Sequence, residues 1–266
     1  MNGLWAYREL LAQLVRREIV VRYRHSLLGI AWALLTPLGM MLLFTFVFTR
    51  AVSLGALASL EAPYPLFLYL GVLPWSLLSA GLSGAVHSLA AHRDLVTKVY
   101  FPRQILPLTQ LASALFDFCV ASVVLVGLVV YYQAASDWRF EPGAALLALP
   151  VVLAVQLLFM TGAGLWLALA HLWFRDVKYL FAVGVQMWMF LTNVLYPLPA
   201  DGSMALRVLA AVNPMVPIIS GYRAIVLEGR LPAAGPLLAA GGAAAVLTAT
   251  ASAAYRVLEG RFAERA

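Results

Sequence analysis

Charged residues are scarce in this sequence, and the places that lack them are informative. They make up 11% of the 266 residues, while 63% are hydrophobic; soluble domains have roughly 25% charged residues. Four long stretches contain no Asp, Glu, Lys or Arg: residues 27–49, 62–91, 142–174 and 231–255. Because roughly 20 apolar helical residues cross a bilayer, these stretches predict a polytopic all-α membrane protein and exclude a soluble fold.

Cysteine and lysine are nearly absent as well. The single cysteine, Cys119, lies in an apolar run, so no disulfide framework or thiolate metal site is available. Neither of the two lysines, Lys98 and Lys178, follows Gly and precedes Ser or Thr, as the phosphate-binding loop of an ATPase requires. The four histidines are isolated in the sequence and predict no metal site. We therefore expect no ATPase, metal or cofactor within this chain.

The apolar runs between charged residues predict six membrane-spanning helices. Their approximate ranges are 27–49, 65–90, 104–132, 143–172, 178–197 and 233–254. With both termini in the cytoplasm, thirteen of the 18 Lys and Arg residues lie on the cytoplasmic side and five on the other, in agreement with the excess of basic residues in cytoplasmic loops. This distribution also accounts for the net charge of +6 without a nucleic-acid partner.

Residues 1–26 predict an amphipathic helix rather than a membrane-spanning one. One face carries apolar residues spaced three and four apart: Leu4, Tyr7, Leu11 and Leu14. Polar side chains, mainly Arg, Glu and Gln, occupy the rest, which favours an amphipathic helix lying in the cytoplasmic interface of the membrane. The alternative is a helix that packs on a protein partner.

Residues 201–232 are too polar and too interrupted to form a simple span. Two short apolar segments flank Asn213 and Pro214, and proline stops the helix before it but is tolerated at the start of the next. The pair predicts re-entrant helices that dip from the outer face. Backbone broken in this way is tolerated in a membrane only where protein or a water-filled cavity shelters it, so we expect a cavity near the outer leaflet.

Asp117 is the only acidic residue well inside a predicted span. A carboxylate within a membrane is costly and suggests a function, but proton-coupled carriers normally have several such groups. We favour a buried hydrogen bond to a neighbouring helix, with three candidate partners: Gln110, Gln156 and Gln186.

The segment Gly81-Leu82-Ser83-Gly84 resembles the serine site of rhomboid-type membrane proteases. A serine nucleophile needs a base within hydrogen-bond reach, and His87 and His171 are the candidates. No His-x-x-x-Asn pair accompanies them, and small residues in membrane helices commonly permit close packing. Helix packing is the preferred interpretation, with a protease as a remote alternative.

Residues 92–107 form a short cytoplasmic loop of mixed charge. A short amphipathic helix ended by Pro102 is natural there. Apolar residues recur along the loop: Leu95, Val96, Val99 and Phe101. A plain polar turn would not need four exposed apolar side chains, so docking of this loop into a protein partner is favoured.

Four short segments then occur in order along nearly the whole chain. They are Arg22-Tyr-Arg-His-Ser-Leu-Leu-Gly-Ile-Ala-Trp32 with Pro37, Gly71-Val-Leu-Pro-Trp75, Lys98-Val-Tyr-Phe-Pro-Arg103 with Pro107, and Asn213-Pro214 with Arg223. Together they resemble the permease subunits of ABC-2 polysaccharide exporters, which export lipid-linked O-antigen, teichoic acid or capsule. The short outer loop at 51–62 departs from the family's pattern.

The resemblance implies a single transmembrane domain over 1–266 in the bacterial cytoplasmic membrane. Two copies of the chain would sit on two copies of a separate ATPase subunit, which binds ATP and Mg. The resemblance also implies an interface helix at 4–17, a coupling loop at 92–106 and outer gate helices at 201–230. The export path would follow the dimer interface, lined by the first, second and fifth spans.

Three groups of residues acquire expected roles from this resemblance. Coupling to the ATPase is assigned to Arg93, Leu95, Lys98, Val99, Tyr100, Phe101 and Arg103. The path of the lipid-linked polysaccharide is assigned to Arg22, Tyr23, Arg24, Trp32, Trp75, Trp188 and Phe190. The outer gate is assigned to Asn213, Pro214 and Arg223.

Two alternatives stay open at this point. Arg22 and Arg24 lie where a lipid-linked pyrophosphate would approach from the cytoplasmic leaflet, but they also suit simple positive-inside anchoring. An ABC-2 permease for drugs or lipids would share the fold of a polysaccharide exporter.

Overall fold

The computed structural model describes residues 6–24, 26–51, 62–91, 101–141, 143–197 and 204–258, and over these ranges it contains helices and no strands. In chain order the helices are α2 (Arg8–Tyr23), α3 (Ala31–Ala51), α4 (Tyr64–Ala91), α6 (Ile105–Ala135), the 3-10 helix η1 (Ala144–Ala148), α7 (Leu149–Trp173), α8 (Val177–Phe190), α9 (Met204–Val212), α10 (Met215–Leu227) and α11 (Ala234–Leu258). The all-α fold class is confirmed for the described part of the chain.

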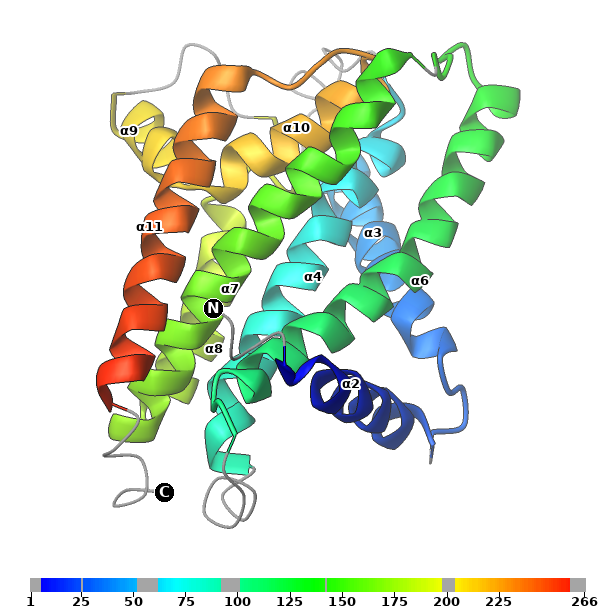
Figure 1. Ribbon diagram of the computed structural model, residues 1–266. Coiled ribbons are helices and arrows are strands. Elements are labelled where there is room, and N and C mark those ends of the chain that lie inside the picture. The colour runs from blue at the N-terminus through cyan, green and yellow to red at the C-terminus, as the bar shows by residue number, and fades with distance from the viewer. Residues whose placement is uncertain are drawn as a thin grey trace.

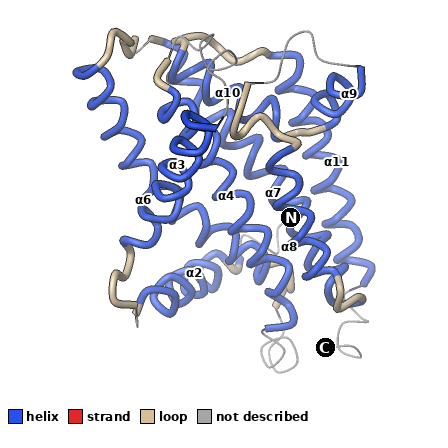
Figure 2. Tube along the Cα trace, turned by 180° about the vertical axis from the view of Figure 1, so that it is seen from behind, coloured by secondary structure: helices blue, strands red, loops and turns tan. Residues whose placement is uncertain are grey.

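The helices form a bundle with two different ends (Figure 1). α2 lies across one end, where α4 and α11 finish and α6 begins, while α9 and α10 lie at the opposite end. The view from behind shows the same arrangement (Figure 2). The first and last described helices therefore reach the same end of the bundle, which we call the α2 end; the other is the α10 end.

Five helical segments are long and apolar enough to cross a membrane: α3, α4, α6, η1 with α7, and α11. Each coincides with a predicted span. The predicted fifth span, 178–197, is helical only over the 14 residues of α8, a length of about 21 Å at 1.5 Å per residue. This is short of the hydrocarbon core of about 30 Å. The chain turns after Phe190, so the described structure has five full-length candidate spans rather than six.

α4 is the central helix of the bundle. It packs against α3, α6, α7, α8 and α10, and 78% of the residues in its most apolar 18-residue stretch are buried. A helix that is hydrophobic on all sides is expected to be buried, which agrees with the charge-free sequence of this segment. Glycines permit the close approach of its neighbours: a Cβ on Gly81 would lie 2.6 Å from the Met160 methyl carbon, and one on Gly84 2.7 Å from Gln110 Oε1.

These glycine contacts explain the segment that resembled a protease site. Gly81 and Gly84 are the positions where α7 and α6 approach α4. The hydrogen bond between His87 and Ser83 joins the ring Nδ1 to the main-chain carbonyl of Ser83, at 2.8 Å. The preferred interpretation, helix packing, accounts for this segment.

α2 packs its apolar face on the protein itself. Tyr7, Leu11 and Leu14 are half-buried against a cluster that includes Phe101 and Tyr255, contributed by the segments that meet at the α2 end. Leu4, the fourth residue of the predicted stripe, lies outside the described residues. The amphipathic helix is thus present, but its stripe contacts the other helices of its own chain, which neither sequence alternative anticipated.

Candidate functional site

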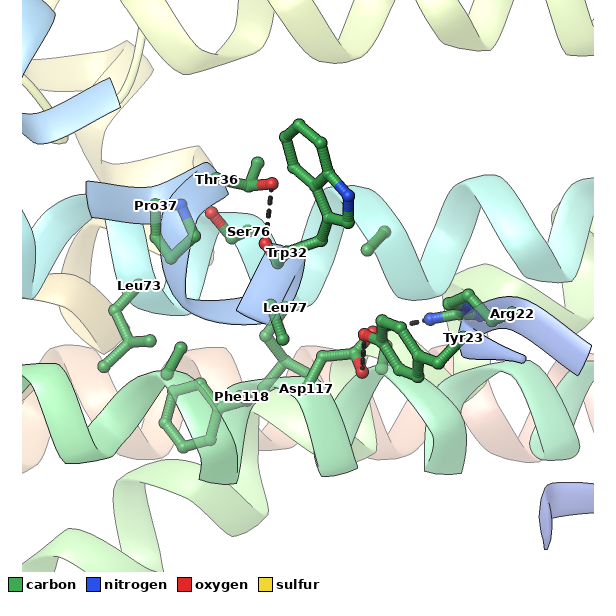
Figure 3. A pocket seen from close by; sticks show the side chains of 14 residues that line it. Arg22, Tyr23, Trp32, Thr36, Pro37, Leu73, Ser76, Leu77, Asp117 and Phe118 are labelled. Carbon is green, nitrogen blue, oxygen red and sulfur yellow. Dashed lines mark hydrogen bonds and ion pairs between the residues drawn. The ribbon is translucent and has the colours of Figure 1, made fainter. Parts of the chain in front are cut away.

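A cavity of about 350 Å³ opens between α2, α3, α4 and α6. Its walls are mainly apolar, and its two charged residues, Arg22 and Asp117, lie together with Tyr23 where α2 ends (Figure 3). The lining residues are Arg22, Tyr23, Trp32, Ala33, Thr36, Pro37, Leu73, Ser76, Leu77, Ala80, Ala114, Asp117, Phe118 and Ala121. We call this the Arg22 cavity. It brings together three predicted path residues, Arg22, Tyr23 and Trp32, whereas Arg24 is exposed and does not line it.

Asp117 of α6 is held by two consecutive residues at the end of α2. Arg22 Nη1 donates to Asp117 Oδ2 at 2.5 Å, and Tyr23 Oη donates to Asp117 Oδ1 at 2.7 Å. Both side chains point toward the carboxylate in Figure 3. The prediction of a glutamine partner for Asp117 is wrong, because α2 packs on α6 and supplies both a cation and a hydroxyl.

The glutamines that were expected to bind Asp117 serve other purposes. Gln156 donates from Nε2 to the main-chain carbonyl of Pro74 at 2.7 Å and accepts from Tyr222 Oη at 3.1 Å. Gln110 lies against Gly84, and Gln186 is exposed. Pro74 is inside α4, where proline removes a helical hydrogen bond, and Gln156 adds a polar contact at that interruption.

The ion pair at the Arg22 cavity is only partly buried. The side chains of Arg22 and Asp117 are 32% and 21% exposed, and Glu18 Oε1 lies 3.9 Å from Arg22 Nη2. Burial raises the pKa of Tyr23 to about 12, and the hydrogen bond to Asp117 adds to this effect. Tyr23 therefore stays protonated as a donor at neutral pH.

α3 supplies the aromatic part of the cavity. Trp32 is 51% exposed, and its main-chain carbonyl accepts a hydrogen bond from Thr36 Oγ1 at 2.9 Å. Pro37 follows inside the helix, where proline bends or interrupts helices. An exposed indole beside a guanidinium and a phenol is a surface that can contact both a sugar and an anion.

A second polar cluster lies at the α10 end, where α8 stops. Trp188 Nε1 donates to Asn213 Oδ1 at 3.0 Å, and Asn213 Nδ2 donates to Thr192 Oγ1 at 2.8 Å. Asn213 Oδ1 also accepts from the main-chain N–H of Met215 at 3.1 Å, at the start of α10. Trp188 meets the ring of Trp75 edge to face, with centroids 5.5 Å apart. Both tryptophans predicted for the path therefore pack here, away from the Arg22 cavity.

Arg223 is the cation of this second cluster and is only 5% exposed. Its guanidinium donates to three main-chain carbonyls, those of Phe67, Asn193 and Val194, and lies 3.5 Å from the centroid of the Phe67 ring. Among the described residues, no carboxylate forms an ion pair with it. Gly71 makes room for it, because a Cβ there would lie 2.6 Å from Arg223 Nη2.

The two short helices predicted on either side of Asn213 and Pro214 are present as α9 and α10; that they form a re-entrant hairpin stays a prediction. Side chains bind the main-chain groups at these breaks, as non-helical backbone in a membrane requires. Asn213 accepts from the N–H of Met215 at the start of α10, and Arg223 donates to the carbonyls of Asn193 and Val194, beyond the end of α8. A cavity of about 960 Å³ lies between α9, α10 and α11, with Phe159 of α7 at its wall, and is lined largely by Ala, Gly and Pro.

Comparison with known proteins identifies the family. Residues 9–227 match the family described as ABC-2 type transporter. The chain is 34% identical over 265 residues to the O-antigen export system permease protein RfbA of Myxococcus xanthus, covering 99% of this chain and 98% of that protein. It is 25% identical over 229 residues to the protein of the same name from Klebsiella pneumoniae, covering 84% of this chain and 82% of that protein. This chain belongs to the ABC-2 transporter family.

The ABC-2 chain is a multi-pass membrane protein, as its apolar helices indicate. Its named relatives are transport permeases rather than enzymes. The remaining expected path residue, Phe190, is 49% exposed at the end of α8.

The expected coupling residues of this ABC-2 chain fall in two groups. Five of them lie outside the described residues: Arg93, Leu95, Lys98, Val99 and Tyr100. Phe101 is described and is 7% exposed, packed in the cluster at the α2 end with Ile105 and Tyr255. Arg103 is half-buried. Phe101 thus contacts its own chain, so a change there would disturb packing as well as any docking.

Proposed function

We propose that this chain is the transmembrane subunit of an ATP-driven exporter that moves a lipid-linked polysaccharide, O-antigen-like or teichoic-acid-like, across the bacterial cytoplasmic membrane. The observation that carries this proposal is the 34% identity, over nearly its full length, to an O-antigen export permease. The Arg22 cavity supports it, because a guanidinium, a phenol and an exposed indole are gathered between α2, α3 and α6.

The proposed topology has six crossings and two cytoplasmic termini. α8 and the turn that follows it, up to residue 197, form the fifth crossing, and α9 with α10 form the re-entrant outer gate. The α2 end is then cytoplasmic, in agreement with the basic residues of α2 and of the loops at that end. The buried Arg223 supports this assignment, because it binds the carbonyls that a short, broken crossing leaves free.

The proposed assembly is a homodimer of this chain on a homodimer of ATPase subunits, which bind ATP and Mg. Apolar side chains stand exposed along α8, including Tyr179, Val183 and Met187. Others stand exposed along α3, including Leu42 and Phe46. These two faces are the proposed dimer contact and the walls of the export path; exposed faces elsewhere contact membrane lipids.

The mechanism follows from how the coupling loop is connected. Residues 92–106 join the end of α4 to the start of α6, and both of these helices line the Arg22 cavity. A push from the ATPase on this loop would therefore act on two walls of the cavity at once. α2 would respond as well, because it packs on α6.

The proposed function is tested by purification of the tagged chain from its native host, followed by assays of ATP turnover. An ABC ATPase should copurify, and addition of lipid-linked glycan should raise the ATP turnover of the complex. If unglycosylated lipids or drugs raise the ATP turnover of the complex and the glycan does not, the chain is instead a permease for those compounds. Absence of a copurifying ATPase would contradict both.

A further inference from the structure

The polar group at the mouth of the Arg22 cavity has the form of an anion site that is already filled. Two donors on consecutive residues, the guanidinium of Arg22 and the phenol of Tyr23, converge on the two oxygens of Asp117, at 2.5 and 2.7 Å. A phosphate group presents a similar pair of oxygens, and arginine binds carboxylates and phosphates with the same fork of N–H groups. The same two donors could therefore hold a phosphate.

The contacts of Asp117 are weak enough to exchange. Its ion pair with Arg22 is 21–32% exposed, and partly exposed ion pairs contribute little to stability. Arg223 is the opposite case, because its guanidinium is 5% exposed and bound by main-chain carbonyls that cannot leave. Of these two arginines, Arg22 is therefore the one whose bound group can be exchanged for another anion.

The cavity beside this group suits a phosphate that carries a lipid chain. Leu73 and Leu77 of α4 and Phe118 of α6 form an apolar wall next to Asp117. Trp32 stands on the α3 side and is half exposed. An isoprenyl diphosphate has both parts that such a site needs: an anionic head for Arg22 and Tyr23, and a hydrocarbon chain for the apolar wall.

We propose that Asp117 occupies, in the empty permease, the position that a phosphate of an isoprenyl diphosphate takes when substrate binds, so that the two compete for Arg22 and Tyr23. This inference rests on the proposed function and names the chemical group recognised at its site. A diphosphate carries more negative charge than a carboxylate and so displaces it. Displacement breaks the hydrogen bonds from Arg22 and Tyr23, at the end of α2, to Asp117 of α6, which frees α6 to move when substrate is present.

The test uses the full-length chain in nanodiscs of zwitterionic lipid, with farnesyl diphosphate as the probe and calorimetry as the binding assay. Asp117→Asn removes the competing charge, and Glu18→Gln removes a carboxylate 3.9 Å from the same arginine but outside the cavity lining. We expect Asp117→Asn to bind the probe about tenfold more tightly than the parent chain, the gain from freeing one charge-assisted contact. Glu18→Gln should stay within about twofold of the parent because its ion pair is long and exposed.

Two further arms complete the test. The gain should disappear in the double variant Asp117→Asn with Arg22→Gln. Farnesyl diphosphate should also bind more tightly than inorganic pyrophosphate, since only the former has a chain for the apolar wall. Equal binding by the parent, Asp117→Asn and Glu18→Gln would overturn the competition, and equal binding of the two probes would overturn the isoprenyl assignment. Asp117→Ser provides a second variant if Asp117→Asn does not fold.

The outcome is separable from that of the proposed function. If the variants show no competition while lipid-linked glycan still stimulates ATP turnover in the complex, only the role of Asp117 is overturned. If glycan stimulation is absent as well, the proposed function is overturned with it.

Discussion

Two of the arginines singled out by the sequence, Arg22 and Arg223, lie in opposite environments. Arg22 is a third exposed and hydrogen-bonded to Asp117, with Glu18 3.9 Å away, at a cavity between helices. Arg223 is 5% exposed and bound to three main-chain carbonyls where α8 ends. The comparison shows that buried and partly exposed arginines can have different roles in one membrane protein. Arg223 satisfies the main-chain carbonyls of a non-helical segment, whereas the partly exposed ion pair of Arg22 can exchange its carboxylate for another anion.

The largest effect is expected from Arg223→Met. The variant leaves the carbonyls of Phe67, Asn193 and Val194 without their donor, and removal of one partner from a buried polar cluster costs about 3–5 kcal/mol. Thermal unfolding in detergent should show a large drop in midpoint and yield. Arg230→Met is the matched control, because Arg230 is exposed just beyond α10, and its midpoint should not change. Equal midpoints for the two variants would remove the distinction between the arginines.

Gly71→Ala tests the same cluster from α4. The added methyl would lie 2.5 Å from the carbonyl oxygen of Val194 and 2.6 Å from Arg223 Nη2, and overpacking of this kind costs about 1–3 kcal/mol. Gly127→Ala in α6 is the control, since its Cβ would meet nothing within 4 Å. The control should unfold at the same temperature as the parent or slightly higher, because alanine favours helix. A harmless Gly71→Ala would mean that α4 and α8 are less closely packed than described.

Asn213→Ala should cost less, about 1–2 kcal/mol, through loss of a helix cap and of the hydrogen bonds to Trp188 and Thr192. Asn213→Asp keeps the acceptor for the N–H of Met215 but loses the donor to Thr192, so its unfolding midpoint should fall between those of the parent and the alanine variant. If the aspartate variant is as unstable as the alanine variant, capping of α10 is not what Asn213 contributes.

Arg22→Gln should leave stability nearly intact, with a loss below about 1 kcal/mol, since partly exposed ion pairs contribute little. Its effect should appear in function, as reduced stimulation of ATP turnover by lipid-linked glycan in the complex. Thermal unfolding and turnover measured on the same preparation separate the two. A stability loss as large as that of Arg223→Met, with turnover per folded complex unchanged, would assign Arg22 a structural role.

The smallest effect concerns Tyr23 at alkaline pH. Because burial and Asp117 raise its pKa from 10.0 to about 12 in the folded state, its contribution to stability is fully present below pH 10 and is lost as the pH rises toward 12. Tyr23→Phe lacks this group, so the difference in unfolding midpoint between parent and variant should narrow over that interval. A constant difference would indicate that the phenol is not held as described.

Much of the fold could be predicted because a membrane imposes simple rules on sequence. The four charge-free runs coincide with α3, α4, α7 and α11, and the predicted span that contains Asp117 coincides with α6, since a helix satisfies all of its backbone hydrogen bonds within the membrane. The non-helical segment after α8 was not foreseen, and its carbonyls at Asn193 and Val194 are bound by Arg223 from another helix. Local sequence does not encode a contact of that kind.

The candidate site was predicted in part. Arg22, Tyr23 and Trp32 were placed together from one short segment, and they do line one cavity. Asp117 was recognised as exceptional, but its partners lie 94 and 95 residues away along the chain and depend on how α2 packs on α6. Trp75 and Trp188 were grouped with the path through the family resemblance, whereas the two rings pack against each other at the second cluster, near Asn213.

The most direct measurement of the central claim is transport in proteoliposomes that contain this chain with its copurified ATPase. Lipid-linked glycan is supplied in the leaflet that faces the ATPase, and its arrival in the opposite leaflet is detected with a lectin that cannot cross the membrane. We predict that glycan arrives only when ATP is present, and that much less arrives with Arg22→Gln. Arrival at the same rate without ATP, or no arrival while the complex is intact and hydrolyses ATP, would contradict it.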